Sequence, residues 1–140
     1  MFDAGIQVLT TGNHVWDKKE IIELIQINKN ILRPHNFPNS KHFSTPGTGV
    51  GIYDVNSTTK LAVINLQGRV FMDSIDCPFQ AIDKILDEIK IQTPNIFIDF
   101  HAETTSEKGA FAWYVDGRVS VVVGTHTHVP TADNRVLPGG

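Results

Sequence analysis

Two histidines spaced two residues apart follow a short apolar run near the end of the chain. Residues 119–123 read Val-Ser-Val-Val-Val, which is typical of a buried strand, and we expect Gly124 to end it before His126 and His128. In an extended chain, residues i and i+2 point to the same side. Both imidazoles are therefore expected to converge on one ligand, and imidazole is the side chain that most commonly binds metal ions.

Two other predicted strands end in side chains of the same kind. Residues 5–10 predict a strand that leads into the Gly12-Asn13-His14 turn, and residues 95–100 predict a strand that leads into His101. In open α/β sheets, ligands bind outside the carboxyl ends of the strands, so these three strand ends are expected to form one site. The candidate residues of this site are Asn13, His14, His101, His126 and His128.

The residue types in this site indicate which chemistry it supports. Neutral imidazoles and one amide oxygen, without thiolates, argue against a closed structural zinc site. They suit a hydrolytic site that holds iron, manganese or zinc and keeps open positions for water and substrate. Such a site also needs carboxylates to balance charge and to bridge two metal ions. The candidate carboxylates are Asp99, Glu103, Glu107 and Asp133.

Three of these carboxylates have distinct expected roles. Asp99 lies two residues before His101 and therefore shares its side of the strand. Glu103 is expected to hold His101 through a hydrogen bond to the ring nitrogen that does not bind metal. Glu107 follows Thr104 by three residues, a spacing that favours a helix-capping role over a metal-binding one.

Helices and strands alternate along much of the chain. The predicted helices span residues 17–27 (with Asp17 as N-cap), 78–89 and 104–115, and further predicted strands span 50–55 and 61–66. The polar residues 56–59 predict a hairpin between these two strands. Residues 31–49 contain three prolines and predict an irregular loop that holds His35 and His42 away from the site. This order predicts a single layered α/β domain over residues 1–140, with a mixed sheet flanked by helices.

Composition and charge restrict the classes of function. The 140 residues carry a formal net charge of −3. The chain shows no excess of basic residues that would indicate binding to a nucleic-acid duplex. No apolar run approaches the ~20 residues that a membrane span requires, and Met1–Ala4 lacks the basic start of a signal peptide. A single cysteine, Cys77, excludes an internal disulfide and fits a reducing compartment. These features predict a cytoplasmic protein that acts on a small molecule.

The order of the motifs resembles the calcineurin-like metallophosphoesterases, and within them the YmdB-like branch of bacterial phosphodiesterases. The resemblance covers nearly all 140 residues. The motifs that carry it are TGNHVWD at 11–17, AVINLQG at 62–68, DFHAE at 99–103, and GTHTHV at 124–129 with TAD at 131–133. It implies the layered fold of that superfamily and hydrolysis of 2′,3′-cyclic nucleotides or related phosphodiesters, as by a 2′,3′-cyclic-nucleotide 2′-phosphodiesterase.

The resemblance also implies a role for each candidate residue. Asn13, His101 and His126 would bind one metal ion, and His128 would bind the other. His14 would donate a proton to the leaving oxygen instead of binding metal. The two ions would be divalent or of mixed valence, with iron the usual metal and manganese or zinc the alternatives. Members of the family often assemble as homo-oligomers.

The chain departs from the family pattern at its two ends. In the family, a metal-binding Asp and a Glu-Asn pair, whose Glu bridges both metals, precede the Gly-Asn-His turn. Only eleven residues precede Gly12 here, and Asp3 stands before the predicted strand. The family also continues into further sheet after Pro138–Gly140. We therefore expect a domain truncated at both ends, which binds one metal weakly, has poor activity, and is marginally stable or oligomeric.

Three functional interpretations remain open at this point. The first is a metal-dependent phosphodiesterase with a dinuclear site and His14 as general acid. The second is a catalytically incomplete, non-enzymatic metal-binding remnant of the same family. The third is a metal-dependent amidohydrolase, and we rank it last because its His-x-His pair typically comes early in a barrel of eight βα units, which 140 residues cannot form.

Overall fold

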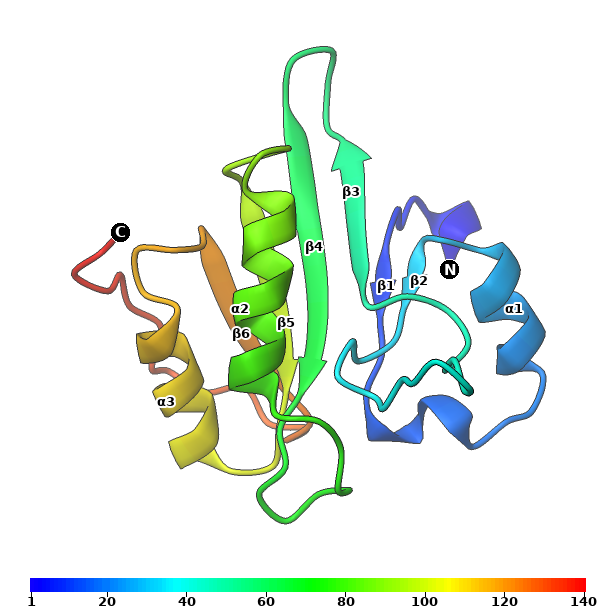
Figure 1. The fold of residues 1–140 in the computed structure, drawn as a ribbon. Helices are drawn as coiled ribbons and strands as arrows, with labels where there is room; N and C mark the ends of the chain where they lie inside the picture. Colours follow the sequence, from blue (N-terminus) through cyan, green and yellow to red (C-terminus); the bar gives the residue numbers. More distant parts are fainter.

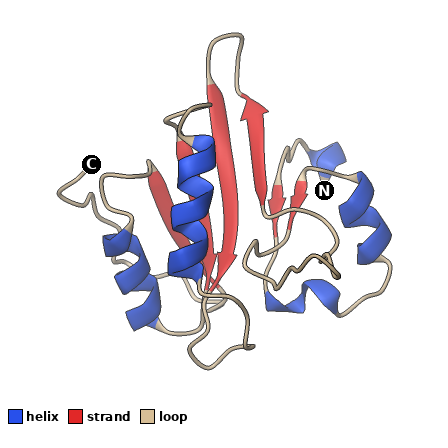
Figure 2. Cartoon of the chain, in the orientation of Figure 1, coloured by secondary structure: helices blue, strands red, loops and turns tan.

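A four-stranded mixed sheet organises most of the molecule. The computed structural model describes all residues from Met1 to Gly140. The strands are β3 (Val50–Asp54), β4 (Lys60–Gln67), β5 (Ile96–His101) and β6 (Val121–Thr125). They lie in the order β3-β4-β5-β6, with β3 antiparallel to β4 and the other pairs parallel. This mixed sheet, with helices packed against it, confirms the predicted α/β class (Figure 2).

The hairpin between β3 and β4 forms where the polar residues predicted it. Asn56 Oδ1 accepts the backbone N–H groups of Thr58 and Thr59 at 3.0 and 2.9 Å, which closes the turn. Such local side-chain bonding to the backbone is the reason that Asn favours turns. Beyond the turn, β4 runs eight residues to Gln67 and pairs along its whole length with β3 or β5.

Helices α2 (Pro78–Ile89) and α3 (Thr105–Tyr114) cover one face of this sheet, as Figure 1 shows. The apolar stripe predicted for α2 packs against alternate residues of β4 and β5, and Phe100 of β5 stacks on Phe111 of α3 at 4.2 Å between ring centroids. The buried residues of this core include Ala62, Ile64, Leu66, Ile82, Ile85, Leu86, Ile89, Ile96 and Ile98. Because side chains alternate along a strand, Asn65, Gln67, Asp99 and His101 lie on the opposite face.

Residues 1–49 form a smaller unit beside β3 (Figure 1). Its elements are the 3-10 turns η1 (Phe2–Ala4) and η2 (Asn13–Trp16), strand β1 (Leu9–Thr10), helix α1 (Ile21–Ile27) and strand β2 (Ile31–Leu32). β1 and β2 pair in parallel, and Val15, Ile25 and Ile31 form a separate small core. The backbone N–H of Thr11 reaches Asn65 Oδ1 at 3.3 Å, which ties this unit to the central sheet.

The predicted loop over residues 31–49 is ordered by a buried arginine. Arg33 is 3% exposed, and its guanidinium donates hydrogen bonds to five backbone carbonyls. These carbonyls belong to Pro34, His35, Thr45, Pro46 and Gly47. The guanidinium presents its N–H donors in a rigid planar arrangement, and these can satisfy carbonyls that have no strand partner. The backbone of this segment is therefore ordered although it has little regular secondary structure. The prediction of a loop was nevertheless wrong for Ile31–Leu32, which form β2.

Three boundaries at the candidate site differ from the sequence prediction. The first strand contains only Leu9–Thr10, and in front of it Gly5, with φ of 87°, closes the η1 turn. Asp17 does not cap α1: it ends η2, and the N-cap position belongs to Glu20, whose side chain makes no capping bond. The last strand does not stop before Gly124, because the parallel ladder with β5 continues to Thr125.

The helices of the structure are all short. The longest, α2, has 12 residues, and none combines the length and the apolar character needed to cross a bilayer.

Candidate metal centre

His101 lies at the centre of the site, at the carboxyl end of β5. β5 and β6 end in register, with His101 beside Thr125, so the next residue, His126, falls next to the imidazole of His101. The Nδ1 atom of His126 is 3.2 Å from His101 Nε2, and the two ring centroids are 5.0 Å apart. The parallel pairing of two strands therefore brings the two imidazoles together, as expected from their positions after the strands.

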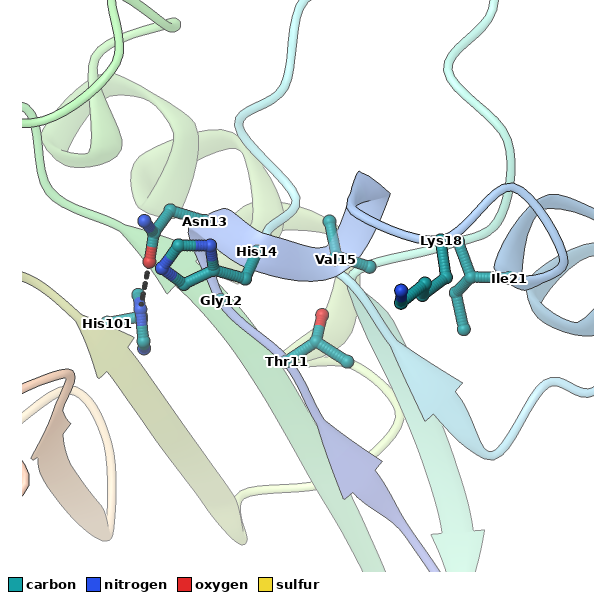
Figure 3. A pocket seen from close by; sticks show the side chains of 8 residues that line it. All are labelled: Thr11, Gly12, Asn13, His14, Val15, Lys18, Ile21 and His101. Atoms are coloured by element: carbon teal, nitrogen blue, oxygen red, sulfur yellow. Dashed lines mark hydrogen bonds between the residues drawn. The ribbon is translucent and has the colours of Figure 1, made fainter.

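Asn13 reaches the same atom from a distant part of the chain. The chain leaves β1, turns at Gly12 and enters η2, which places Asn13 Oδ1 2.8 Å from His101 Nε2 although 88 positions separate them (Figure 3). A Cβ atom at position 12 would overlap the His101 ring. Glycine is thus required at this position by the close approach of backbone to imidazole.

The three groups that converge here suit a metal ion. Burial, assisted by nearby His126 and Lys108, lowers the pKa of His101 to about 4, so this imidazole is neutral at pH 7. Neutral imidazole nitrogens and an amide oxygen all carry lone pairs that a divalent cation accepts. The donor set formed by Asn13, His101 and His126 therefore fits one metal ion with open positions.

His126 is held by an acidic partner and by an unusual backbone conformation. Its Nε2 atom lies 2.6 Å from a carboxylate oxygen of Glu103. Its φ of 98° lies in the left-handed region, which non-glycine residues rarely adopt and which often marks functional positions. The predicted contact between Glu103 and His101 was wrong, because Glu103 follows β5 and reaches across to the end of β6.

His128 does not join the other candidates. The predicted convergence of His126 and His128 assumed an extended chain, but the backbone leaves the extended conformation at His126. His128 is exposed and makes no hydrogen bond to Asn13, His101 or His126. It lies near enough for its charge to contribute to the lowered pKa of His101.

His14 lies beside the converging groups, in the wall of a cavity of about 390 Å³. The cavity is lined by Thr11, Gly12, Asn13, His14, Val15, Lys18, Ile21 and His101, which Figure 3 shows. Its volume falls within the range of small-molecule sites, about 300–1,000 Å³. The Nδ1 atom of His14 lies 3.0 Å from Asp17 Oδ2, so Asp17, predicted as a helix cap, instead orients this histidine.

No carboxylate occupies a bridging position in the structure. No group of three His, Cys, Asp or Glu side chains is arranged to hold a metal ion, and the third converging group is the amide of Asn13. Asp99 is buried behind His101, where it accepts a hydrogen bond from Thr125 and where burial raises its pKa. Asp133 pairs with Thr131 in the exposed tail.

The role of Glu107 is wider than the predicted helix cap. Thr104 Oγ1 accepts the backbone N–H of Glu107 at 3.3 Å, as in a capping motif. The Glu107 carboxylate, however, does not reach back to Thr104 and accepts the backbone N–H groups of Arg69 and Val70.

Sequence reasoning missed two polar residues of this region. Thr125 contacts both Asp99 and His101, and Lys18 lines the cavity four residues after His14. Thr125 lies inside the Gly-Thr-His-Thr-His motif, directly before His126. Its position in this motif could have indicated a contact with the candidate ligands. Nothing in the local pattern distinguishes Lys18 from its exposed neighbour Lys19.

Comparison with known proteins identifies close relatives over the whole chain. A Bacillus subtilis (strain 168) protein named 2′,3′-cyclic-nucleotide 2′-phosphodiesterase is 54% identical over 140 residues, which are 100% of this chain and 51% of the relative. The chain spans about half the length of the curated relatives it matches.

Two solved structures share the fold. A hypothetical protein from Thermus thermophilus superposes with a TM-score of 0.91 at 42% identity, over 99% of this chain and 52% of that protein. A novel phosphatase from Mycoplasma pneumoniae superposes with a TM-score of 0.86 at 36% identity, over 99% of this chain and 49% of the other. The family model described as YmdB-like protein matches residues 1–140. This chain therefore belongs to the YmdB-like protein family, as its motifs indicated.

Proposed function

We propose that this chain carries a metal-dependent phosphodiesterase site that acts on 2′,3′-cyclic nucleotides or related small phosphodiesters. The observation that carries this function is the convergence of Asn13 Oδ1 and His126 Nδ1 on His101 Nε2, at 2.8 and 3.2 Å. Family membership supports the reaction class, and the name of the Bacillus subtilis relative supports the substrate class. The adjoining cavity of about 390 Å³ suits a small substrate.

Asn13, His101 and His126 would hold the first metal ion, and His128 would contribute to a second. Two divalent or mixed-valence ions, iron in the first place and manganese or zinc as alternatives, would stabilise charge on the phosphoryl oxygens and activate water when bound. The second ion would require a carboxylate in addition to His128. Two cations repel each other in a partly buried site, and a negatively charged group offsets that repulsion.

His14 would act as general acid. Asp17 accepts the Nδ1 proton of His14 in this arrangement, which leaves Nε2 to donate a proton to the departing ribose oxygen. The side chain lines the cavity beside Asn13, so it can reach a substrate that lies against the metal site (Figure 3). General acid assistance of this kind is typically worth about 10²–10⁴-fold in rate.

The second candidate is a non-enzymatic metal-binding remnant of the family. The cavity beside His101 and the orientation of His14 favour the enzyme over this alternative. An amidohydrolase is set aside, because the chain belongs to the YmdB-like family and forms an open sheet of four strands. Assembly as a homo-oligomer and a cytoplasmic location remain predictions.

Metal content and activity together test this function. The chain would be purified without oxygen, its metal content measured by elemental analysis, and its hydrolysis of 2′,3′-cyclic AMP followed. We expect at least one metal ion per chain, with loss of that metal in His101→Ala. His42→Ala is the matched control, because His42 is exposed and lies in a different loop.

Each result has a defined meaning. Two metal ions per chain with hydrolysis support the dinuclear enzyme. One ion without hydrolysis supports the metal-binding remnant. Metal content that His101→Ala does not reduce contradicts both.

A further inference from the structure

Behind His101, a threonine and an aspartate form a line of hydrogen bonds that leads away from the converging ligands. Thr125 Oγ1 donates to Asp99 Oδ1 at 2.7 Å, and His101 Nδ1 lies 2.9 Å from Thr125 Oγ1. The parallel register of β5 and β6 sets His101 directly beside Thr125, while Asp99 lies two residues back on the same face. The line is therefore built from neighbouring strands of the sheet, not from flexible loops.

The chemistry of these groups determines which nitrogen of His101 carries the proton. A hydroxyl has a single proton, and a carboxylate can only accept. Because the proton of Thr125 is directed to Asp99, the Thr125 oxygen is left to accept from His101, so Nδ1 is the protonated nitrogen. A neutral imidazole has one N–H, and Nε2 therefore carries a lone pair.

The Asp99 end of this line is itself held firmly. The side chain of Thr10 in β1 also lies close enough to Asp99 to lower the pKa of its carboxyl, against the effect of burial. The backbone carbonyl of Asp99 accepts from the amide of Asn65 at 3.4 Å, and Asp99 is only 4% exposed. Burial and the contacts with neighbouring strands thus restrict Asp99, and through its carboxylate they restrict the direction of the Thr125 hydroxyl.

The other side of His101 faces acceptors. Nε2 lies 2.8 Å from Asn13 Oδ1 and 3.2 Å from His126 Nδ1. With Nε2 unprotonated, its lone pair and that of the Asn13 oxygen approach each other closely. A shared cation is the ligand that satisfies both at once.

We propose that Thr125 and Asp99 are positioning residues that fix His101 in its Nδ1–H tautomer and so direct the Nε2 lone pair at a divalent cation. This inference rests on the proposed function only in assuming that the cation binds at His101. Neither residue touches the cation or a substrate. They act through the imidazole, as hydrogen-bonded partners of metal-binding histidines do.

The tautomer is measurable in the metal-free chain. The 140-residue chain, labelled with ¹⁵N-histidine and treated with chelator, would be studied by long-range ¹H–¹⁵N correlation at neutral pH. The signals of His101 would be assigned by their loss in His101→Gln. We expect a protonated Nδ1 and an unprotonated Nε2. A protonated Nε2, or an equal mixture of tautomers, would overturn the inference.

Three variants test the positioning role through metal affinity, with Zn²⁺ as the probe in a competition titration against a coloured chelator. Thr125→Val keeps the shape but removes the hydroxyl, and we expect about 10–100-fold weaker Zn²⁺ binding together with loss of the tautomer preference. Thr125→Ser retains the hydroxyl and is expected to restore both. Thr127→Val is the matched control, because the Thr127 hydroxyl bonds only Lys108.

The outcomes separate this inference from the proposed function. Unchanged Zn²⁺ affinity and an unchanged tautomer in Thr125→Val would overturn the positioning role. If Thr125→Val fails to fold, the Zn²⁺ affinity of Thr125→Ser and the tautomer spectrum of the parent still test the positioning role. A parent chain that binds no Zn²⁺ would overturn the proposed metal site. The tautomer assignment is tested separately, by the spectrum of the metal-free chain.

Discussion

The carboxylate of Glu107 accepts the backbone N–H of Arg69 at 2.9 Å, across 38 positions of sequence. It also accepts the N–H of Val70 at 3.1 Å, and the residue is only 8% exposed. This pairing ties the loop after β4 to the first turn of α3. Since Gly68 in the same loop donates its N–H to the carbonyl of His101 at 2.9 Å, the contact also supports the carboxyl end of β5.

Replacement of Glu107 by alanine is expected to destabilise the fold. The change removes the acceptor of two partly buried hydrogen bonds, and a hydrogen bond of this kind typically contributes about 0.5–1.5 kcal/mol. Urea unfolding followed by circular dichroism measures this free energy. Glu23→Ala, at an exposed position of α1, is the control and is expected to stay within about 0.5 kcal/mol of the parent. Equal stability of the two variants would contradict the structural role of Glu107.

Gly12→Ala is expected to weaken metal binding without unfolding the chain. The added Cβ would overlap the ring of His101, so either the imidazole or the η2 turn must move, and Asn13 would lose its alignment. We expect a loss of Zn²⁺ affinity of about 10–100-fold, as for other disturbances around metal-binding histidines. A titration that finds the parent affinity in this variant would show that the close approach has no role in binding.

Gly109→Ala is expected to stabilise the protein. Gly109 lies inside α3, and a Cβ at this position meets no atom within 4 Å. Because glycine in a helix interior is about 0.5–1 kcal/mol less favourable than alanine, the free energy of unfolding should rise by about that amount. The same urea experiment measures it. A decrease in stability would mean that the space beside Gly109 is needed for packing.

His14→Ala is expected to reduce hydrolysis of 2′,3′-cyclic AMP by about 10²–10⁴-fold while metal content stays at the parent level. The reason is that His14 is assigned to proton donation and lies in the cavity wall beside the ligands. His42→Ala again serves as control. Loss of metal in His14→Ala would reassign this histidine as a ligand, and unchanged turnover would remove it from the mechanism.

Stability of the metal-free chain is expected to fall in mild acid because of His35. Burial, followed by the nearby charge of Arg33, lowers the pKa of His35 below its ordinary value of 6.5. The unfolded chain therefore binds a proton at a pH where the folded chain does not. The contribution of His35 is fully present above about pH 6.5 and is lost as the pH falls below that value.

Urea unfolding at a series of pH values measures this effect. His35→Asn is expected to show a shallower decline in acid than the parent, and His42→Asn, at an exposed position, is expected to keep the decline of the parent. Identical pH profiles for the parent and His35→Asn would contradict the assignment. Because His101 also has a lowered pKa, some decline should remain in every variant.

Local patterns in the sequence predicted the central elements well. The α2 helix begins at Pro78 and buries the apolar stripe read from its periodicity, and α3 starts after the Thr104 cap. β5 was predicted from a run of apolar residues between Pro94 and His101. These elements depend on propensity, capping and burial of one face, which neighbouring residues determine.

Local patterns failed where a boundary depends on distant partners. β6 continues through Gly124 because Gly124 and Thr125 pair with Phe100 and His101 of β5. β1 is short because only β2 pairs with it. Asp17 contacts His14 instead of capping a helix, because residues 17–20 form a turn and α1 begins only at Ile21.

By itself, the sequence determined the family, the α/β class and the set of residues from which the site is drawn, because motif order and periodicity are properties of the chain. Only the tertiary structure decided how those residues meet. Asn13 contacts His101 across 88 positions, Glu103 contacts His126, and His128 stays exposed without a hydrogen bond to the other candidates. Strand register and the bend at His126 set these contacts, and both arise from packing between segments far apart in the chain.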